Sequence, residues 1–445
     1  MQLREHLDKG IWAIADKVLL LMYGLAVIVV VVNVLPEKEW GVFSIYQSIF
    51  LILSVLADSI FLQPMVKFAS EHEAEVDHVL AASFNLYSVS MMVAGTIIAF
   101  FSEPIAAFFK SPELLEMLPF LPLLIFLSIF RNVGVRYLQV YYRINAIFWV
   151  DLTFFGSIIV ITVLGTAFGM FHSAYDFMIA NILGAAISSI TTIAFCARAF
   201  RRMPLLSVPP HEYSRIYSFA KYQAGTSALL TLQQWSDTLL VGAFYTPHEA
   251  GVYSAAKNLY RFIDAVREGA TLLVVPVSSR LYSAGDFKAL RSLVEKLLFI
   301  SFAALIPISI GFAIFAEPIM DIVYRGKYQG VSSVFQVLIL AGFTLPLSLI
   351  STNVLIGMGK TKSLFLATLG AVIIFFILSL VFVPPLASMG AALAVFISMT
   401  VLALLTFFAM RKEVDISTSG ILSRAANVKQ FVRDRLAESE APSGE

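Results

Sequence analysis

Residues 363–384 read SLFLATLGAVIIFFILSLVFVP, and residues 388–410 read SMGAALAVFISMTVLALLTFFAM. Neither stretch contains a charged residue, and each is long enough to cross the hydrocarbon of a bilayer, for which a helix needs about 20 mostly apolar residues. Runs of this kind recur along the whole chain of 445 residues. The fold class that they predict is an all-α polytopic membrane protein.

The overall composition leads to the same class and excludes others. Apolar residues make up 59% of the chain and charged residues 14%, whereas soluble domains average about 45–50% and about 25%. A soluble enzyme has too little interior for so many apolar side chains. The net charge of +1 and the single cysteine, Cys196, argue against a nucleic-acid-binding protein and against a disulfide scaffold.

Twelve apolar runs are long enough to span a membrane. They lie near residues 11–35, 41–63, 79–101, 118–139, 147–169, 176–198, 216–243, 250–275, 292–315, 332–356, 363–384 and 388–410.

Basic residues in the loops predict the orientation of these spans. With the N-terminus in the cytoplasm, fifteen Lys and Arg residues fall in cytoplasmic loops, and the outer side holds only Lys38, Lys110, Arg325 and Lys327. Lys and Arg concentrate on the cytoplasmic side of membrane proteins. We therefore expect both termini in the cytoplasm.

The chain divides near its midpoint. Residues 1–198 and 216–410 are expected to form an N-terminal and a C-terminal lobe of six helices each, joined by a cytoplasmic linker at 199–215 that is rich in Arg and Pro. Residues 411–445 form a polar cytoplasmic tail. Its apolar residues at helical spacing are compatible with an amphipathic surface helix or with a solvated tail.

Two short matches indicate an internal repeat. Glu39–Ser44 reads EWGVFS and Glu249–Ser254 reads EAGVYS, while Phe101–Ile105 reads FSEPI and Phe315–Ile319 reads FAEPI. The offsets are 210 and 214 residues, so one register serves both matches with a small insertion between them. Because each repeat holds an even number of spans, the lobes run in the same direction and are related by an axis along the membrane normal. Transporters of this design bind substrate between the lobes.

The predicted span at 250–275 carries charges on one helical face. The residues of this face are Tyr253, Lys257, Arg261, Asp264 and Glu268, with Arg267 beside them. Each charge at the bilayer centre costs at least about 2.5–3.5 kcal/mol, so the face must meet protein or water. Either it is a buried ion network, or it lines a translocation path, which we favour. The 210-residue offset maps Gln47, Ser54 and Asp58 onto the same face of the second span.

Other spans contribute polar residues. Arg131, Asn132, Arg136 and Gln139 gather on the fourth span, while Thr226, Gln233 and Asp237 share a face of the seventh. Asp16 and Lys17 lie near one end of the first, and Asp151 of the fifth is too shallow to be counted as a site residue. The deep basic residues suit a substrate that carries phosphate. The expected substrate-binding residues are Lys257, Arg261, Arg131, Arg267 and Arg136, and the expected cavity or ion-coupling residues are Asp264, Glu268, Asp237, Asp58, Gln47, Tyr253, Asp16 and Lys17.

The sequence contains no glycine-rich phosphate loop and no spaced pair of metal-ligating histidines on an apolar helix. We expect no catalytic residue, no metal and no cofactor.

The stretch Gln233–Pro276, QQWSDTLLVGAFYTPHEAGVYSAAKNLYRFIDAVREGATLLVVP, together with the loop Gly357–Thr361, resembles bacterial polysaccharide flippases of the Wzx type. These belong to the multidrug/oligosaccharidyl-lipid/polysaccharide exporter superfamily. The resemblance implies a multidrug-extruder-like fold and a cationic cavity on Lys257, Arg261 and Arg131. It also implies that the chain flips a polyprenyl-diphosphate-linked oligosaccharide across the bacterial inner membrane, with membrane lipids and polysaccharide polymerase or export machinery as partners and a monomer as the transport unit. The acidic neighbours of the basic residues depart from a strictly cationic cavity.

Two rival hypotheses remain. An ion-coupled exporter of drugs or organic cations would use a net acidic cavity built from Asp237, Asp264, Glu268 or Asp58. A membrane glycosyltransferase or polymerase would be expected to place acidic catalytic groups on a large outer loop, and the predicted outer loops are short.

Overall fold

The structure is a computed structural model of the chain. It describes residues 2–71, 76–219, 223–328 and 330–416. Within these ranges, only the backbone is described for residues 2–10, 70–71, 218–219, 223 and 262–273. Within this part of the chain, every regular element is a helix, as the apolar runs predict. The surface helix predicted in the C-terminal tail lies outside the described residues.

In the described residues of its first half, the chain forms nine α-helices and three short π or 3₁₀ segments. They are α1 (Gln2–Ala26), η1 (Val27–Val32), α2 (Glu37–Ala57), η2 (Asp58–Leu62), α3 (Gln63–Glu71), α4 (Val76–Phe100), α5 (Ser102–Phe108), α6 (Pro112–Met117), η4 (Leu118–Phe120), α7 (Leu121–Val140), α8 (Ile144–Ala167) and α9 (Ala174–Arg202).

The second half continues in the same manner. Its elements are α10 (Pro210–Phe219), α11 (Gln223–Phe244), α12 (Pro247–Ser283), α13 (Phe287–Ile314), α14 (Ala316–Tyr324), α15 (Val331–Leu340), η5 (Ala341–Phe343), α16 (Leu345–Gly357) and α17 (Thr361–Arg411).

Among the described residues, eight helices are long and apolar enough to cross a membrane, or nine if the pair Val331–Phe343 and Leu345–Gly357, bent by 47°, counts as one span. The difference from the predicted twelve has two causes. Predicted spans 363–384 and 388–410 are continuous in α17, which departs from helical geometry at Ala387 (φ 49°) after two prolines. Helices α11 and α12 fall outside this set, and α12 carries the predicted stripe of charges, which lowers its mean hydropathy.

The surface of the bundle is suited to lipid. On α4, Val89, Val93, Ile97 and Phe100 recur at helical spacing, and their side chains are exposed. Exposed apolar stripes of this size are uncommon in soluble monomers. The structure is therefore that of a multi-pass membrane protein.

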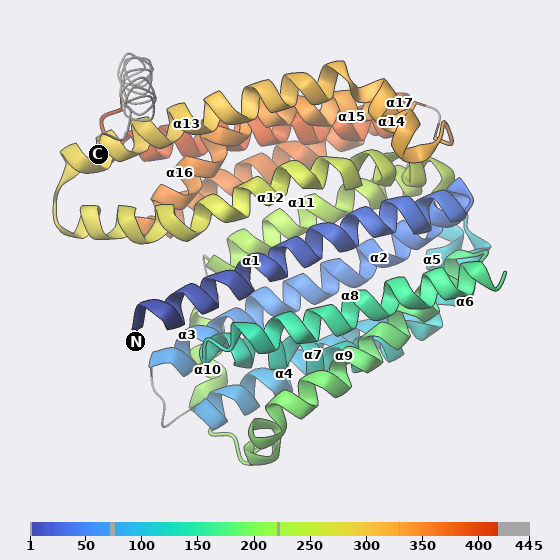
Figure 1. Cartoon of the computed structure of the whole chain (residues 1–445), viewed down its shortest axis with the longest axis horizontal. Coiled ribbons are helices and arrows are strands. Elements are labelled where there is room, and N and C mark those ends of the chain that lie inside the picture. The colour runs from blue at the N-terminus through green and yellow to red at the C-terminus, as the bar shows by residue number, and fades with distance from the viewer. Residues whose placement is uncertain (1, 72–75, 220–222, 329, 417–445) are drawn as a thin grey trace, which may run out of the picture.

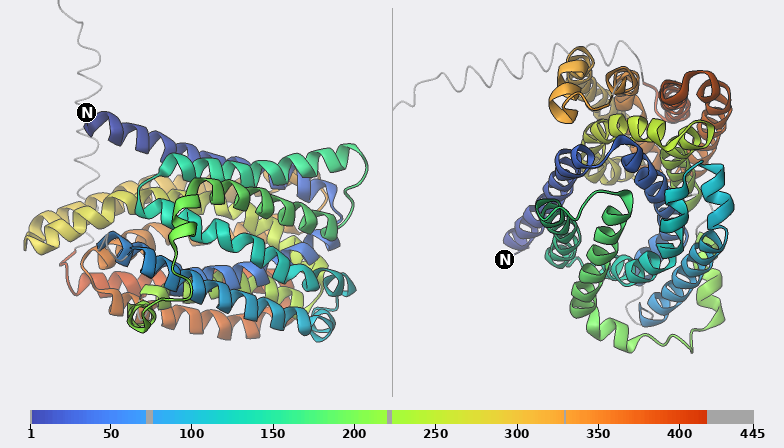
Figure 2. Two further views of the ribbon diagram at one scale, coloured as in Figure 1. Left: turned by 90° about the horizontal axis from the view of Figure 1, so that it is seen from below. Right: turned by 90° about the vertical axis from the view of Figure 1, so that its right-hand side faces the viewer.

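The helices run side by side along one long axis (Figure 1). Figure 1 shows α5, α6 and α14 at one end of the bundle, here named the α14 end, and α3 and α10 at the other, the α10 end. Helices α1, α4, α7, α8 and α9 pack against one another, as do α11, α12, α16 and α17. Helix α2 packs against both α11 and α12 and so joins the two sets. The right-hand view of Figure 2 faces the α14 end, so that the helices of the bundle are seen end-on.

The crossing of α2 and α12 obeys the 210-residue offset of the repeat. A Cβ atom on Gly41 would lie 1.6 Å from the carbonyl oxygen of Pro247, and one on Gly251 would lie 2.5 Å from that of Glu37. These two contacts are the same contact with the halves exchanged. The equivalent residues Ser44 and Ser254 hydrogen-bond to each other, with their Oγ atoms 2.9 Å apart. Reciprocal contacts of this kind are the mark of a two-fold axis.

Candidate functional site

The polar side chains of the second half line a cavity of about 250 Å³ between α11, α12, α15, α16 and α17. Leucine, valine and methionine side chains form much of its wall. Its polar lining consists of Gln233, Gln234, Asp237, Tyr253, Lys257, Tyr260, Arg261, Ser348, Thr352 and Asn353. Helical spacing places Tyr253, Lys257 and Arg261 on one face of α12, as the sequence predicts.

A buried ion pair lies at the centre of this lining. The Lys257 ammonium donates to both carboxylate oxygens of Asp237, at 2.6 and 2.8 Å, and also to the carbonyl of Gln234. The Tyr253 hydroxyl donates to the same carboxylate at 2.7 Å. Asp237 is 2% exposed and Lys257 8%. A charge that is almost completely buried is stable only when it is paired and hydrogen-bonded. Lys257 and Asp237 therefore stabilise each other.

Arg261 lies one helical turn further along α12. Its guanidinium stacks over the ring of Trp235 at 4.3 Å, and the Lys257 ammonium lies 5.2 Å from the same ring. An aromatic face attracts a cation by its quadrupole, more strongly away from water. The sequence does not predict Trp235 as a site residue. An aromatic residue in an apolar span does not stand out in the way that a charged residue does.

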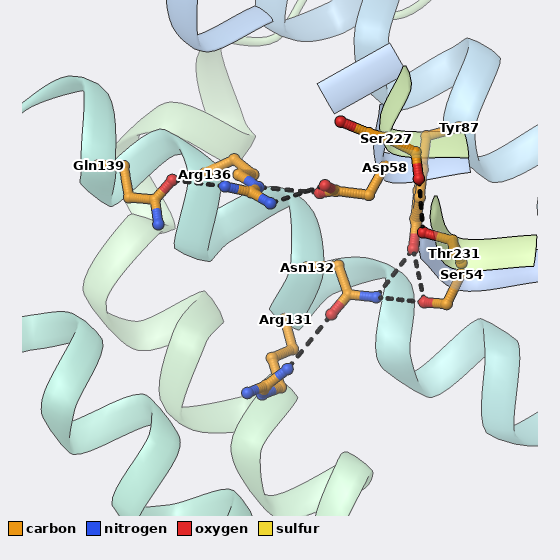
Figure 3. Close-up of polar contacts among 9 residues, drawn as sticks. All are labelled: Ser54, Asp58, Tyr87, Arg131, Asn132, Arg136, Gln139, Ser227 and Thr231. Atoms are coloured by element: carbon orange, nitrogen blue, oxygen red, sulfur yellow. Dashed lines mark hydrogen bonds and ion pairs between the residues drawn. The ribbon is translucent and has the colours of Figure 1, made fainter. Parts of the chain in front are cut away.

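A second polar cluster lies in the first half and is drawn in Figure 3. Arg136 on α7 forms a two-point ion pair with Asp58 at the start of η2, with its Nε and Nη2 atoms 2.8 and 2.6 Å from the carboxylate oxygens. Its third donor reaches Gln139 at 2.9 Å. Two parallel bonds of this kind are the strongest arrangement available to an arginine.

The cluster continues through neutral groups. The Asn132 amide donates to the Tyr87 hydroxyl at 2.8 Å, and the Ser54 hydroxyl lies 3.4 Å from both. Figure 3 shows Ser227 and Thr231 of α11 beside this network. The polar face of α11 from the second half therefore adjoins the polar face of α2 from the first.

Arg131 donates to the Asn132 amide oxygen at 3.3 Å (Figure 3) and so connects this cluster to a third group. Its other terminal nitrogen forms an ion pair with Asp151 of α8, and its guanidinium stacks over Phe154 at 4.4 Å. The sequence places Asp151 too near the end of its span to be counted as a site residue. The packing of α7 against α8 nevertheless brings it to Arg131, and the sequence does not show this pairing.

The remaining predicted residues are placed as follows. Lys17 is exposed on α1, and Gln47 is half-buried on α2. The backbone of Asp264, Arg267 and Glu268 continues α12, but their side chains lie outside the described residues.

The three groups share an electrostatic design. Arg136, Arg131 and Lys257 each hold a carboxylate from a neighbouring helix, namely Asp58, Asp151 and Asp237. A phosphate that binds any of these cations competes with a carboxylate already in place.

The sequence matches a known family over most of its length. Residues 30–334 match the sequence model of the family described as "Polysaccharide biosynthesis protein". A probable low-salt glycan biosynthesis flippase, Agl15 of Haloferax volcanii, is 24% identical over 202 residues. This match covers 44% of the chain and 42% of that relative, so it spans less than half of either protein.

Solved structures share the fold. An inward-facing multidrug resistance MATE family transporter of the MOP superfamily has a TM-score of 0.74 at 14% identity and covers 90% of this chain and 94% of its own. The lipid II flippase MurJ in an inward closed conformation has a TM-score of 0.74 at 17% identity, covering 98% and 94%. Both solved structures are less than 25% identical to the chain, and what they share with it is the fold. The chain belongs to the polysaccharide biosynthesis protein family.

Proposed function

We propose that the chain moves a polyprenyl-diphosphate-linked oligosaccharide from the inner to the outer face of the cell membrane during polysaccharide biosynthesis. The family supports this function, and so does the printed role of the relative Agl15 as a probable glycan flippase. The observation that carries the proposal is the cavity in the second half, where Lys257 and Arg261 bring two cations into an apolar bundle.

In this proposal each part of the substrate meets a matching surface. The diphosphate docks on Lys257 and Arg261, displacing the Asp237 carboxylate from the ammonium. The sugars meet the amides and hydroxyls of the cavity, and the lipid tail stays in the membrane. Arg136 and Arg131 provide a second cationic region in the first half.

Movement follows from two six-helix lobes, residues 1–198 and 216–410, that rock about an axis along the membrane normal with the linker 199–215 between them. Twelve membrane crossings with both termini in the cytoplasm suit this design. The reciprocal contacts at the crossing of α2 and α12 support it, because a two-fold relation lets one motion close one end as it opens the other.

The test is complementation of a bacterial strain that lacks its own oligosaccharide flippase. The parent chain is expected to restore surface polysaccharide, and Arg261→Ala is expected to abolish it at equal protein levels. Full polysaccharide from the Arg261→Ala variant would refute the assigned role of the cavity.

An ion-coupled exporter of organic cations is the second candidate. The carboxylates of Asp58, Asp151 and Asp237 inside the bundle favour it, because an exporter of this kind needs acidic groups that bind the coupling ion. Resistance of cells to cationic dyes, without any gain of surface polysaccharide, would select this function over the first.

A further inference from the structure

Two lysines at the α14 end each reach a helix terminus in the opposite half of the chain. Lys110 follows α5, and its ammonium donates to the carbonyl of Tyr245, just past the end of α11, at 3.3 Å. Lys327 follows α14, and its ammonium donates to the carbonyls of Asn33 at 2.9 Å, Val32 at 3.4 Å and Leu35, just past the end of η1.

The acceptor ends of the two contacts correspond under the internal repeat, while the donor lysines are 217 residues apart. Leu35 and Tyr245 are 210 residues apart, which is the offset that relates Ser44 to the Ser254 hydroxyl it contacts. Both lysines also follow corresponding turns. The chain reverses after α5 at Lys110 itself (φ 52°) and after α14 at Arg325 (φ 54°). Each half thus sends a lysine to the same terminus of the other half.

The acceptors suit a cation. The carbonyls at the C-terminal end of a helix lack partners within the helix and carry the negative end of its dipole. A lysine ammonium placed there neutralises that charge and satisfies the carbonyls. The contact is therefore favourable while the two halves touch at this end, and it cannot survive their separation.

Other contacts at the α14 end accompany Lys327. The Asn33 amide donates to the carbonyl of Val323 at 2.9 Å, and the Tyr328 hydroxyl to that of Val32 at 3.4 Å. His248 and Glu37, at the starts of α12 and α2, lie 2.5 Å apart. Lys38, by contrast, pairs with Glu113 of α6 inside the first half.

We propose that Lys110 and Lys327 are paired latches that hold the α14 end of the transport passage closed, and that both release when the passage opens at that end. The proposal rests on the alternating access proposed above, and it concerns the gating step rather than the substrate. The latches differ in strength, since Lys327 has three carbonyl acceptors and Lys110 has one.

The test is the reactivity of a cysteine placed in the cavity. Ser348 lines the cavity, and the sole native cysteine, Cys196, is buried. Labelling of the Ser348→Cys variant therefore reports the accessibility of the cavity, with little labelling of Cys196. A membrane-impermeant maleimide is added to sealed vesicles of each orientation. Loss of each latch by Lys110→Gln or Lys327→Gln is expected to raise labelling from the α14 side by about two- to fivefold, the weight of one charge at a helix terminus.

Three controls make the result decisive. Lys38→Gln removes a lysine from the same end without touching a contact between halves, and is expected to leave labelling unchanged. Lys110→Arg and Lys327→Arg retain the charge and are expected to restore low labelling. A disulfide between Ser44→Cys and Ser254→Cys is expected to suppress labelling in the glutamine variants until it is reduced.

Equal labelling of parent and glutamine variants would overturn the latches, as would an equal rise in Lys38→Gln or a rise that persists under the disulfide. If Lys327→Gln accumulates poorly, labelling of the Lys110→Gln variant alone tests the proposal, because this variant loses only one exposed contact. Labelling needs no glycan. If the variants show the expected labelling but the chain moves no lipid-linked oligosaccharide, the latch proposal stands and the proposed substrate is wrong.

Discussion

The Lys257–Asp237 pair allows a structural role to be separated from a role in transport. Lys257→Met removes the ammonium and leaves the Asp237 carboxylate, 2% exposed, with the hydroxyls of Tyr253 and Thr238 as side-chain donors. Breaking a buried pair from one side costs about 3–5 kcal/mol. We expect the free energy of unfolding to fall by that amount.

Adding Asp237→Asn to Lys257→Met removes the stranded charge as well. Replacing both members of a buried pair by neutral groups is often neutral in stability, so the double variant is expected to recover to within about 1–2 kcal/mol of the parent. If Lys257 binds the substrate diphosphate, the recovered protein still fails to transport.

The assay has two readings. Chemical unfolding in mixed micelles measures stability, and surface polysaccharide in the complemented strain measures transport. Lys38→Met, which breaks an ion pair with a lysine side chain that is 52% exposed, is the matched control and should cost about 1 kcal/mol or less. A double variant that transports like the parent would refute the reasoning and leave Lys257 a purely structural residue.

Three further perturbations test the interface and the second cluster. Gly251→Ala places a methyl group 2.5 Å from the Glu37 carbonyl oxygen, so α2 and α12 must separate, and thermal unfolding in detergent should occur at a lower temperature than in the parent. Oxidation of the Ser44→Cys, Ser254→Cys pair, whose parent Oγ atoms are 2.9 Å apart, should stop transport in vesicles, and reduction should restore it; uninterrupted transport would show that this contact need not break. Arg136→Gln should destabilise the fold by less than the about 3–5 kcal/mol of a buried pair broken from one side, because the Arg136 side chain is 29% exposed. Asp58→Asn added to it should recover most of that loss, and unfolding curves that show no recovery would contradict the ion pair.

The sequence predicts the helices well because the apolar runs are long and the cost of burying unpaired backbone in lipid leaves few alternatives. It also predicts the register of the repeat, which the Ser44–Ser254 contact bears out. The count of spans is harder, since the bent α15–α16 pair and the kinked α17 depend on tertiary packing.

The sequence alone does not predict which side chains pair with the charged residues. Spacing along one helix places Lys257 and Arg261 on a common face, but it does not show that Asp237 of another helix reaches Lys257. Asp151 was discounted by its depth, yet it pairs with Arg131, because pairing depends on the rotation of α8 against α7. Side-chain partners across helices are set by packing, which a single sequence does not display.

Reconstitution tests the central claim most directly. Purified protein is placed in vesicles with a fluorescent polyprenyl-diphosphate-linked oligosaccharide, and the fraction that reaches the opposite leaflet is followed with an impermeant glycosidase. The account predicts that the parent moves the lipid faster than vesicles containing the Lys257→Met, Asp237→Asn double variant. Equal rates in parent, double-variant and protein-free vesicles would contradict it.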